Sequence, residues 1–157
     1  MIHPAPALFH TTERAGVGPA VPLADLTRSW QAARVALRFT ADGTAHDPGP
    51  RVVGHDDLGT LALLAAQIHP GAPRPPDVDV LEEAARTSPW MLATLDAIAT
   101  SASLRTAATA LTIHHSTLQS RLAQAARVIP WPLSTPDGRL RLHLALTARR
   151  LHRNPPT

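Results

Sequence analysis

The sequence contains no cysteine, no lysine and no tyrosine, and aromatic residues make up only 3% of its 157 residues. Without cysteine the chain can form no disulfide, and it offers neither a thiolate ligand for zinc nor a thiol nucleophile. Its core must therefore be built mainly from leucine, alanine, valine and isoleucine. Apolar residues make up 44% and charged residues 17%, which is typical of a folded chain rather than of a wholly disordered one.

Two patterns that direct proteins to membranes are also missing. The first six residues, MIHPAP, have neither the charged start nor the continuous apolar run of a signal peptide. No window approaches the roughly 18 uninterrupted apolar residues of a transmembrane helix. We therefore expect a soluble, cytoplasmic protein without a membrane partner, with one domain of ordinary size or two small ones.

The basic residues, all fifteen of them arginine, are distributed unevenly along the chain. Residues 1–96 carry seven arginines and eleven acidic residues, whereas residues 97–157 carry eight arginines and the single acid Asp137. The net charges are therefore −4 and +7. A coding bias toward arginine would explain the absence of lysine but not this segregation. The segregation favours a polyanionic partner, such as nucleic acid, for the C-terminal part.

A proline-rich segment divides the chain. HPGAPRPPD, at residues 69–77, has four prolines, which restrict the backbone and prevent a helix from crossing it. Such a segment is typical of a semi-extended linker. We predict an N-terminal α/β region over residues 1–68, the linker over residues 69–79, and a C-terminal helical domain over residues 80–157.

Before the linker, the patterns predict a partial α/β arrangement. The expected elements are helices over residues 27–39 and 58–68, a short strand over residues 51–55, and a strand end near residues 16–18. Trp30 of the first helix is expected to anchor the core, and Arg38 is expected on the opposite side of that helix. Trp90 and Trp131, elsewhere in the chain, are also expected to be core residues. These elements cannot form a complete sheet with both faces covered, so they predict only part of a domain.

After the linker, every segment predicts helix. The expected helices cover residues 80–87, residues 88–98, residues 104–111, residues 115–129 and residues 139–152. The last of them is expected to bury Leu140, Leu144 and Leu151. The fold class is therefore mainly α, with a C-terminal bundle of about five helices preceded by a partial α/β segment.

The segment LRTAATALTIHHSTLQSRL, at residues 104–122, has the pattern of two short helices joined by a tight turn. Its apolar positions form an inner stripe on each helix, and Ile113 would fill the angle between them. The expected buried residues are Leu104, Ala107, Ala108, Leu111, Leu118 and Leu122. A helix-turn-helix that inserts its second helix into the DNA major groove has this form, but so do packed helices in many bundles.

If the segment binds DNA, the exposed side chains at the start of its second helix would read base edges. These side chains belong to His115, Ser116, Gln119 and Ser120. Glutamine can form two hydrogen bonds with adenine, serine can bond to any of several bases, and histidine can bond to a base or a phosphate. The side chains suited to phosphate contacts, which position the helix without reading sequence, belong to Arg105, Thr117 and Arg121.

The segment AATALTIHHSTLQSRL resembles the Fis-type helix-turn-helix of PucR/CdaR-type bacterial transcriptional regulators, with the approximate pattern A-x-x-L-x-I/V-H-R-N-T-L-R-Y-R-L. DGRLRLHLALTARRL is similar to the closing helix of that family, and LEEAARTSPWMLATLDAIATSAS to the helices before the motif. GVGPAVPLADLTRSWQAARVALRF and RVVGHDDLGTLALLAA resemble the second half of its degenerate GGDEF-like (CdaR) domain. The resemblance covers about residues 14–152 in the order of the family.

This resemblance implies a transcription regulator, truncated within its GGDEF-like domain, that binds double-stranded DNA through the second helix. His114 matches the family pattern and joins the expected site residues. The family has Arg-Asn where this chain has His115 and Ser116, and Arg-Tyr where it has Gln119 and Ser120. Losing two arginines removes two charge-assisted contacts with DNA. Because a single small domain makes few base contacts, specific binding would require a homodimer or higher oligomer on paired half-sites.

Catalysis and metal binding have little support in the sequence. His114 and His115 are adjacent, so on a helix they diverge by about 100°, and the nine histidines show no recognised ligand spacing. No serine lies in a nucleophile elbow, and the acidic signature of a GGDEF cyclase is missing. We therefore expect no enzyme activity, no metal and no cofactor.

Three functions remain open at the level of sequence. The favoured one is a DNA-binding regulator. The alternative is a degenerate helix-turn-helix module that binds protein instead of DNA, which the loss of the two arginines favours and the charge of +7 opposes. A small α-helical enzyme would need a polar pocket that the sequence does not indicate.

Overall fold

The computed structural model describes residues 13–156, so residues 1–12 of the predicted N-terminal region lie outside the described part. The chain forms two compact units. Of the described residues, the first unit comprises residues 13–43, 49–73 and 150–156, and the second comprises residues 44–48 and 74–149. Neither unit is continuous in sequence.

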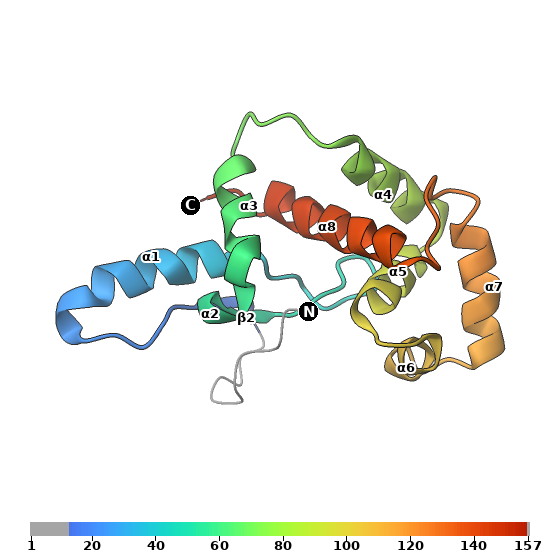
Figure 1. Cartoon of the computed structure of the whole chain (residues 1–157), viewed down its shortest axis with the longest axis horizontal. Helices are drawn as coiled ribbons and strands as arrows, with labels where there is room; N and C mark the ends of the chain where they lie inside the picture. The colour runs from blue at the N-terminus through green and yellow to red at the C-terminus, as the bar shows by residue number, and fades with distance from the viewer. Residues whose placement is uncertain (1–12, 157) are drawn as a thin grey trace. The chain divides into compact units, whose positions relative to one another are not determined.

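Figure 1 labels the helices and strands in chain order. The first unit contains β1 (Ala15–Val17), α1 (Leu26–Leu37), β2 (Val52–Gly54), α2 (His55–Leu58) and α3 (Ala62–Gln67), with single 3-10 turns at Leu23–Asp25 and Gly59–Leu61. The second contains α4 (Pro76–Thr87), α5 (Met91–Thr100), α6 (Leu104–Ala110), α7 (His115–Ala125) and α8 (Pro136–Arg153), whose last residues belong to the first unit. The prediction of a mainly α fold with a small α/β segment is confirmed.

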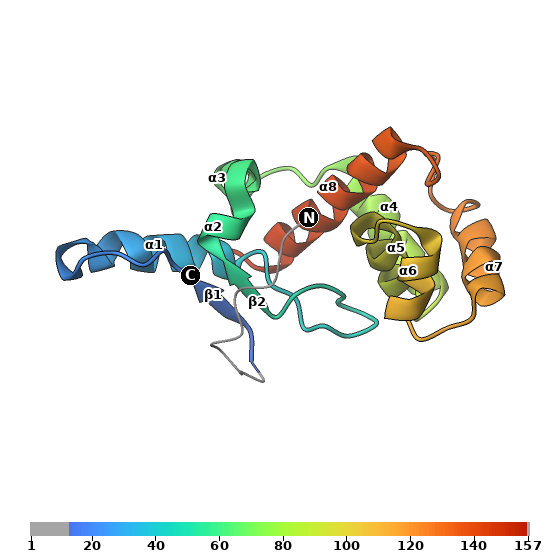
Figure 2. The same cartoon turned by 60° about the horizontal axis from the view of Figure 1, so that its bottom comes forward.

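The two strands of the first unit pair in parallel, with Ala15 opposite Val52, and α1 belongs to the connection between them. Figure 2 shows β1 and β2 side by side. Gly16 lies directly beneath α1, because a Cβ atom there would overlap the backbone of Ala33 and Leu37. Glycine is thus required for the close approach of this helix and strand.

The core of the first unit is small, and the prediction that Trp30 anchors a core is wrong. Trp30 is 66% exposed, although Ala36 and Phe39 further along the same segment are fully buried. Strands of three residues span only about 10 Å, whereas the twelve residues of α1 span about 18 Å. The strands are therefore too short to cover the whole length of α1.

Arg38 and Gly59 overturn two further expectations in the first unit. Arg38, expected on the exposed side of its helix, is buried because backbone carbonyl groups accept hydrogen bonds from its guanidinium group. The helix expected over residues 58–68 is divided into α2, a 3-10 turn and α3. It breaks at Gly59, whose φ of 51° and ψ of −130° are incompatible with a continuing α-helix.

The second unit has a larger core, formed by α4, α5, α8 and the segment after α7. Its buried side chains include Leu81, Leu95, Trp131, Leu142 and Leu146. Trp131 is therefore a core residue as predicted. The predicted burial of two leucines of α8 is wrong, because Leu140 and Leu144 are 59% and 39% exposed.

The inward stripe of α8 differs from the expected one and includes a charged side chain. Arg149 is only 4% exposed and forms ion pairs with Asp47, at 3.3 Å, and with Glu82, at 2.9 Å. These two carboxylates allow the arginine to be buried beside the leucines of the core.

Two helix ends differ from their predicted positions. α4 begins at Pro76 rather than near residue 80, because proline is well tolerated in the first turn of a helix. α7 ends at Ala125 rather than at Ile129, and the following N–H groups of Arg127 and Val128 make tighter turns of the 3-10 type. Among residues 13–156, no helix is both long and apolar enough to cross a membrane.

Candidate nucleic-acid interface

A side-chain cap begins the first helix of the predicted helix-turn-helix. Ser103 precedes α6, and its hydroxyl oxygen accepts a hydrogen bond from the N–H of Thr106 at 3.1 Å. This bond satisfies one of the N–H groups that have no partner within the helix. The first helix therefore starts at a defined residue, Leu104.

The turn after α6 is a Schellman motif. The N–H of Ile113 donates to the carbonyl of Ala108 at 3.0 Å, and the N–H of Thr112 donates to that of Thr109 at 3.0 Å. Thr112 has a φ of 54°, the left-handed conformation that this motif requires and that glycine usually provides. A β-branched residue in this conformation is strained. The turn thus fixes the direction in which the chain leaves α6.

His114 caps the second helix, a role that the sequence analysis did not identify. Its Nδ1 accepts a hydrogen bond from the N–H of Ser116 at 3.3 Å and lies 2.7 Å from the Ser116 hydroxyl oxygen. To accept from an N–H, Nδ1 must carry no proton. The signal in the sequence was the position of His114 between a helix end and a new helix, where an acceptor side chain is favoured.

The angle between α6 and α7 is filled as predicted, with one exception. Ala107, Ala108 and Leu118 are buried in one cluster, and Leu111, Ile113 and Leu122 pack against it. Leu104, predicted to belong to the same stripe, is 38% exposed. Because alanine side chains are short, the two helices can approach each other closely at this cluster.

The predicted base-reading residues share one exposed polar face at the start of α7. His115, Ser116, Gln119 and Ser120 are all exposed. Residues three or four positions apart on a helix are neighbours on its surface, so these side chains form one contiguous patch. Figure 1 shows α6 and α7 joined by the short turn that precedes this patch. We call these four residues the α7 polar face.

The predicted phosphate contacts differ in their surroundings. Arg105 and Thr117 are exposed. Arg121 is partly buried, and its guanidinium carbon lies 4.9 Å from the centre of the Trp90 ring, a cation–π arrangement. One of its nitrogens also lies 3.5 Å from the hydroxyl oxygen of Thr94. This geometry favours a role for Arg121 in holding α7 against α5.

The charge segregation seen in the sequence is largely lost in the folded second unit. This unit contains eight arginines and seven acidic residues, so its net charge is only +1. Arg141 pairs with Asp77 through two hydrogen bonds of 2.8 Å, and Arg149 pairs with carboxylates from the loop 44–48 and from α4. The net charge of +1 of the second unit therefore favours nucleic-acid binding less than the +7 of residues 97–157 does.

Two exposed arginines remain close in sequence to the helix pair. Arg105 lies in α6 and Arg127 follows α7, and neither takes part in an ion pair with another described residue. Within residues 13–156, no three histidine or acidic side chains gather in a way that could hold a metal ion. The region therefore offers a polar helix face and two exposed arginines close to the helix pair in sequence.

This part of the chain is similar to a known family of helix-turn-helix domains. Residues 91–148, which run from the start of α5 into α8, match the sequence model of the PucR C-terminal helix-turn-helix domain. The chain has no match among curated proteins or solved structures. The match covers the capped helix, the Schellman turn and the α7 polar face described above. Residues 91–148 are thus similar to the PucR C-terminal helix-turn-helix domain.

Proposed function

We propose that the chain is a DNA-binding transcription regulator that reads the major groove with α7, beginning at His115. The observation that carries the proposal is the α7 polar face, which is exposed at the start of the second helix of a PucR-type helix-turn-helix. In helix-turn-helix proteins, the N-terminal residues of the second helix contact base edges. A regulator of this kind acts by binding to DNA and requires no catalytic residue.

Each side chain of the interface has a proposed role. Gln119 would bond an adenine through two atoms, and His115, Ser116 and Ser120 would contact neighbouring bases or phosphates. The positive end of the α7 dipole would favour a phosphate near the start of this helix.

Arg105 and Thr117 are the proposed phosphate contacts, together with Arg127. We assign a smaller share to Arg121, because its guanidinium group lies over Trp90. His114 would act by holding the first turn of α7 in place, since it caps that helix. The protein backbone and these side chains would together fix the helix in the groove.

The rest of the chain supports a regulator built from two units. The parallel β1–α1–β2 arrangement supports the proposal that the first unit derives from a GGDEF-like (CdaR) domain, of which the sequence resembles the second half. The small number of base-reading side chains supports binding as a homodimer or higher oligomer on two half-sites, since each half-site would contribute few contacts.

The proposal is tested by fluorescence anisotropy with two DNA duplexes, the upstream intergenic DNA of the gene and a scrambled duplex of equal composition. Gln119→Ala should weaken binding to the native duplex by about 1–3 kcal/mol and leave binding to the scrambled duplex unchanged. Gln124→Ala is the matched control, because Gln124 is exposed on α7 but lies outside the polar face. Equal losses for both variants, or no preference for the native duplex, would contradict base reading by this face.

A salt titration tests the phosphate contacts separately. Arg105→Ala should lower the slope of log affinity against log salt by about 1, because one phosphate contact is lost. Arg86→Ala removes the same charge from α4 of the same unit and should leave the slope unchanged. An equal decrease for both variants would reveal a general charge effect rather than a contact at the helix pair.

The net charge of +1 favours a second candidate, a degenerate helix-turn-helix module that binds protein. The double variant His115→Arg with Ser116→Asn separates the two functions. For a weakened DNA reader, restoring arginine should raise the affinity for DNA by about tenfold, since it adds a charge-assisted bond. If the folded wild-type chain and this variant both fail to bind DNA at low salt, the protein-binding module is the better description.

A further inference from the structure

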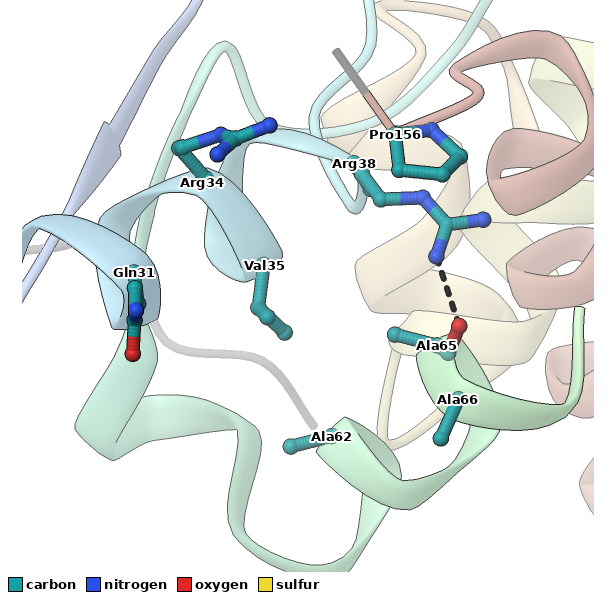
Figure 3. A pocket seen from close by; sticks show the side chains of 8 residues that line it. All are labelled: Gln31, Arg34, Val35, Arg38, Ala62, Ala65, Ala66 and Pro156. Carbon is teal, nitrogen blue, oxygen red and sulfur yellow. Dashed lines mark hydrogen bonds between the residues drawn. The ribbon is translucent and has the colours of Figure 1, made fainter. Parts of the chain in front are cut away.

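The first unit contains a pocket whose lining combines apolar side chains with two arginines. It lies between α1 and α3, has a volume of about 340 Å³, and is open to solvent at exposed residues such as Gln31 and Ala66. Val35 and Ala62 contribute to its apolar lining. Figure 3 shows side chains of α1 along one side of this pocket and the alanines of α3 along the other. Its volume is within the range of small-molecule sites, roughly 300–1,000 Å³.

One wall of the pocket carries a buried positive charge that no described carboxylate neutralises. Arg38 is 7% exposed, and four backbone carbonyls accept hydrogen bonds from its guanidinium group. The acceptors are Asn154 at 2.9 Å, Ala65 at 2.6 Å, Leu151 at 3.2 Å, and Ile68. These bonds fix the side chain in place, but neutral carbonyls do not cancel its charge. Consistently, desolvation lowers the pKa of Arg38, with no acidic group acting against it.

A second arginine lies in α1, the helix that Arg38 directly follows. Arg34 is one turn before Arg38, it is exposed, and it lines the pocket without an ion pair to any residue in the described part of the chain. Like charges four residues apart on a helix repel each other. An anion bound near both guanidinium groups would remove this repulsion and would complete the hydrogen bonding of Arg38, whose five N–H groups have four acceptors.

We propose that this pocket binds a small organic anion, a carboxylate with an aliphatic or aromatic body. The carboxylate would lie at the arginine side of the pocket, and the apolar body would lie against Val35 and the alanines of α3. The apolar lining favours this class of ligand over inorganic anions, which have no apolar body. The two arginines favour it over neutral apolar molecules, which have no charge. The site belongs to the first unit alone, so it goes beyond the proposed binding of DNA and is tested without it.

Isothermal titration calorimetry of the full chain with octanoate tests the proposal. Octanoate should bind saturably, whereas octanamide, which has the same body without the charge, should bind at least tenfold more weakly. Inorganic phosphate should also bind at least tenfold more weakly, because it has charge but no apolar body. Equal binding of either control compound, or no saturable binding of octanoate, would overturn the proposal.

Substitutions then locate the site. Arg34→Gln should weaken octanoate binding by about tenfold or more, because a charge-assisted contact is lost. Arg28→Gln is the matched control, since Arg28 is an exposed arginine of α1 that does not line the pocket. Ala66→Leu should weaken binding of octanoate by filling the pocket, while far-UV circular dichroism shows an unchanged fold. Equal effects of the two arginine variants, or unchanged binding in Ala66→Leu, would place octanoate elsewhere and overturn the assignment.

Discussion

Replacing Thr112 by glycine should make the protein more stable, although glycine usually destabilises. Thr112 has a φ of 54°, a conformation that costs an L-amino acid about 1–2 kcal/mol. Glycine adopts it without strain, but its more flexible unfolded state offsets about 0.4–1 kcal/mol of that gain. Thr112 is exposed, and its side chain has no hydrogen bond to another described residue. The expected net gain is therefore about 0.5–1 kcal/mol in the free energy of unfolding.

Urea denaturation of the full chain, followed by circular dichroism, measures this gain. Thr109→Gly is the control, because Thr109 is an exposed threonine within α6, where glycine lowers helix propensity and removes a hydrogen bond to the Arg105 carbonyl. This control should be less stable than the wild type by about 0.5 kcal/mol or more. The reasoning about strain would be refuted if Thr112→Gly destabilised the protein in the same direction as Thr109→Gly.

Three further predictions concern other parts of the structure. Gly16→Ala should destabilise the protein by at least about 2 kcal/mol in urea denaturation, because the added Cβ overlaps the backbone of α1; an unchanged midpoint would contradict that packing. Asp47→Ala should cost about 3 kcal/mol or more in the same assay, because it removes one of the carboxylates that neutralise buried Arg149; a loss typical of an exposed residue would contradict the ion pair. A hydrogen bond from Arg141 holds the pKa of Asp77 below its usual value, so Asp77 adds stability above about pH 4 that is lost as pH falls through its lowered pKa. The stability difference between wild type and Asp77→Asn should accordingly shrink on acidification, and a difference independent of pH would argue against this pair.

The helix-turn-helix could be predicted from sequence because its determinants are local. The buried positions Ala107, Ala108 and Leu118 recur at helical spacing within a few turns, and the structure buries them together. The capping by His114 and the left-handed Thr112 were missed, since neither residue type is the usual one for its position. A local pattern thus located the helices but not the backbone details that orient them.

Properties that depend on distant parts of the chain could not be predicted in this way. The charge of the C-terminal segment is reduced by carboxylates such as Asp47 and Asp77, which precede it in sequence. The exposure of Trp30 depends on how far the short strands extend along α1, and that length is not encoded in α1 itself. The burial of Arg38 likewise requires acceptors from two separate segments of the first unit, around Ala65 and at Leu151 and Asn154.

The pairing of Asp47 with Arg149 has a practical consequence for dissecting this protein. A fragment that starts in the proline-rich segment, at Arg74, would include every helix of the second unit but would omit the loop 44–48. Arg149 would then retain Glu82 but lose one of its two counterions within the core. A protein fragment that contains the second unit without this loop should therefore be compared with two variants of the same fragment. One variant carries a neutral residue at position 149, and the other supplies the missing loop as a grafted peptide.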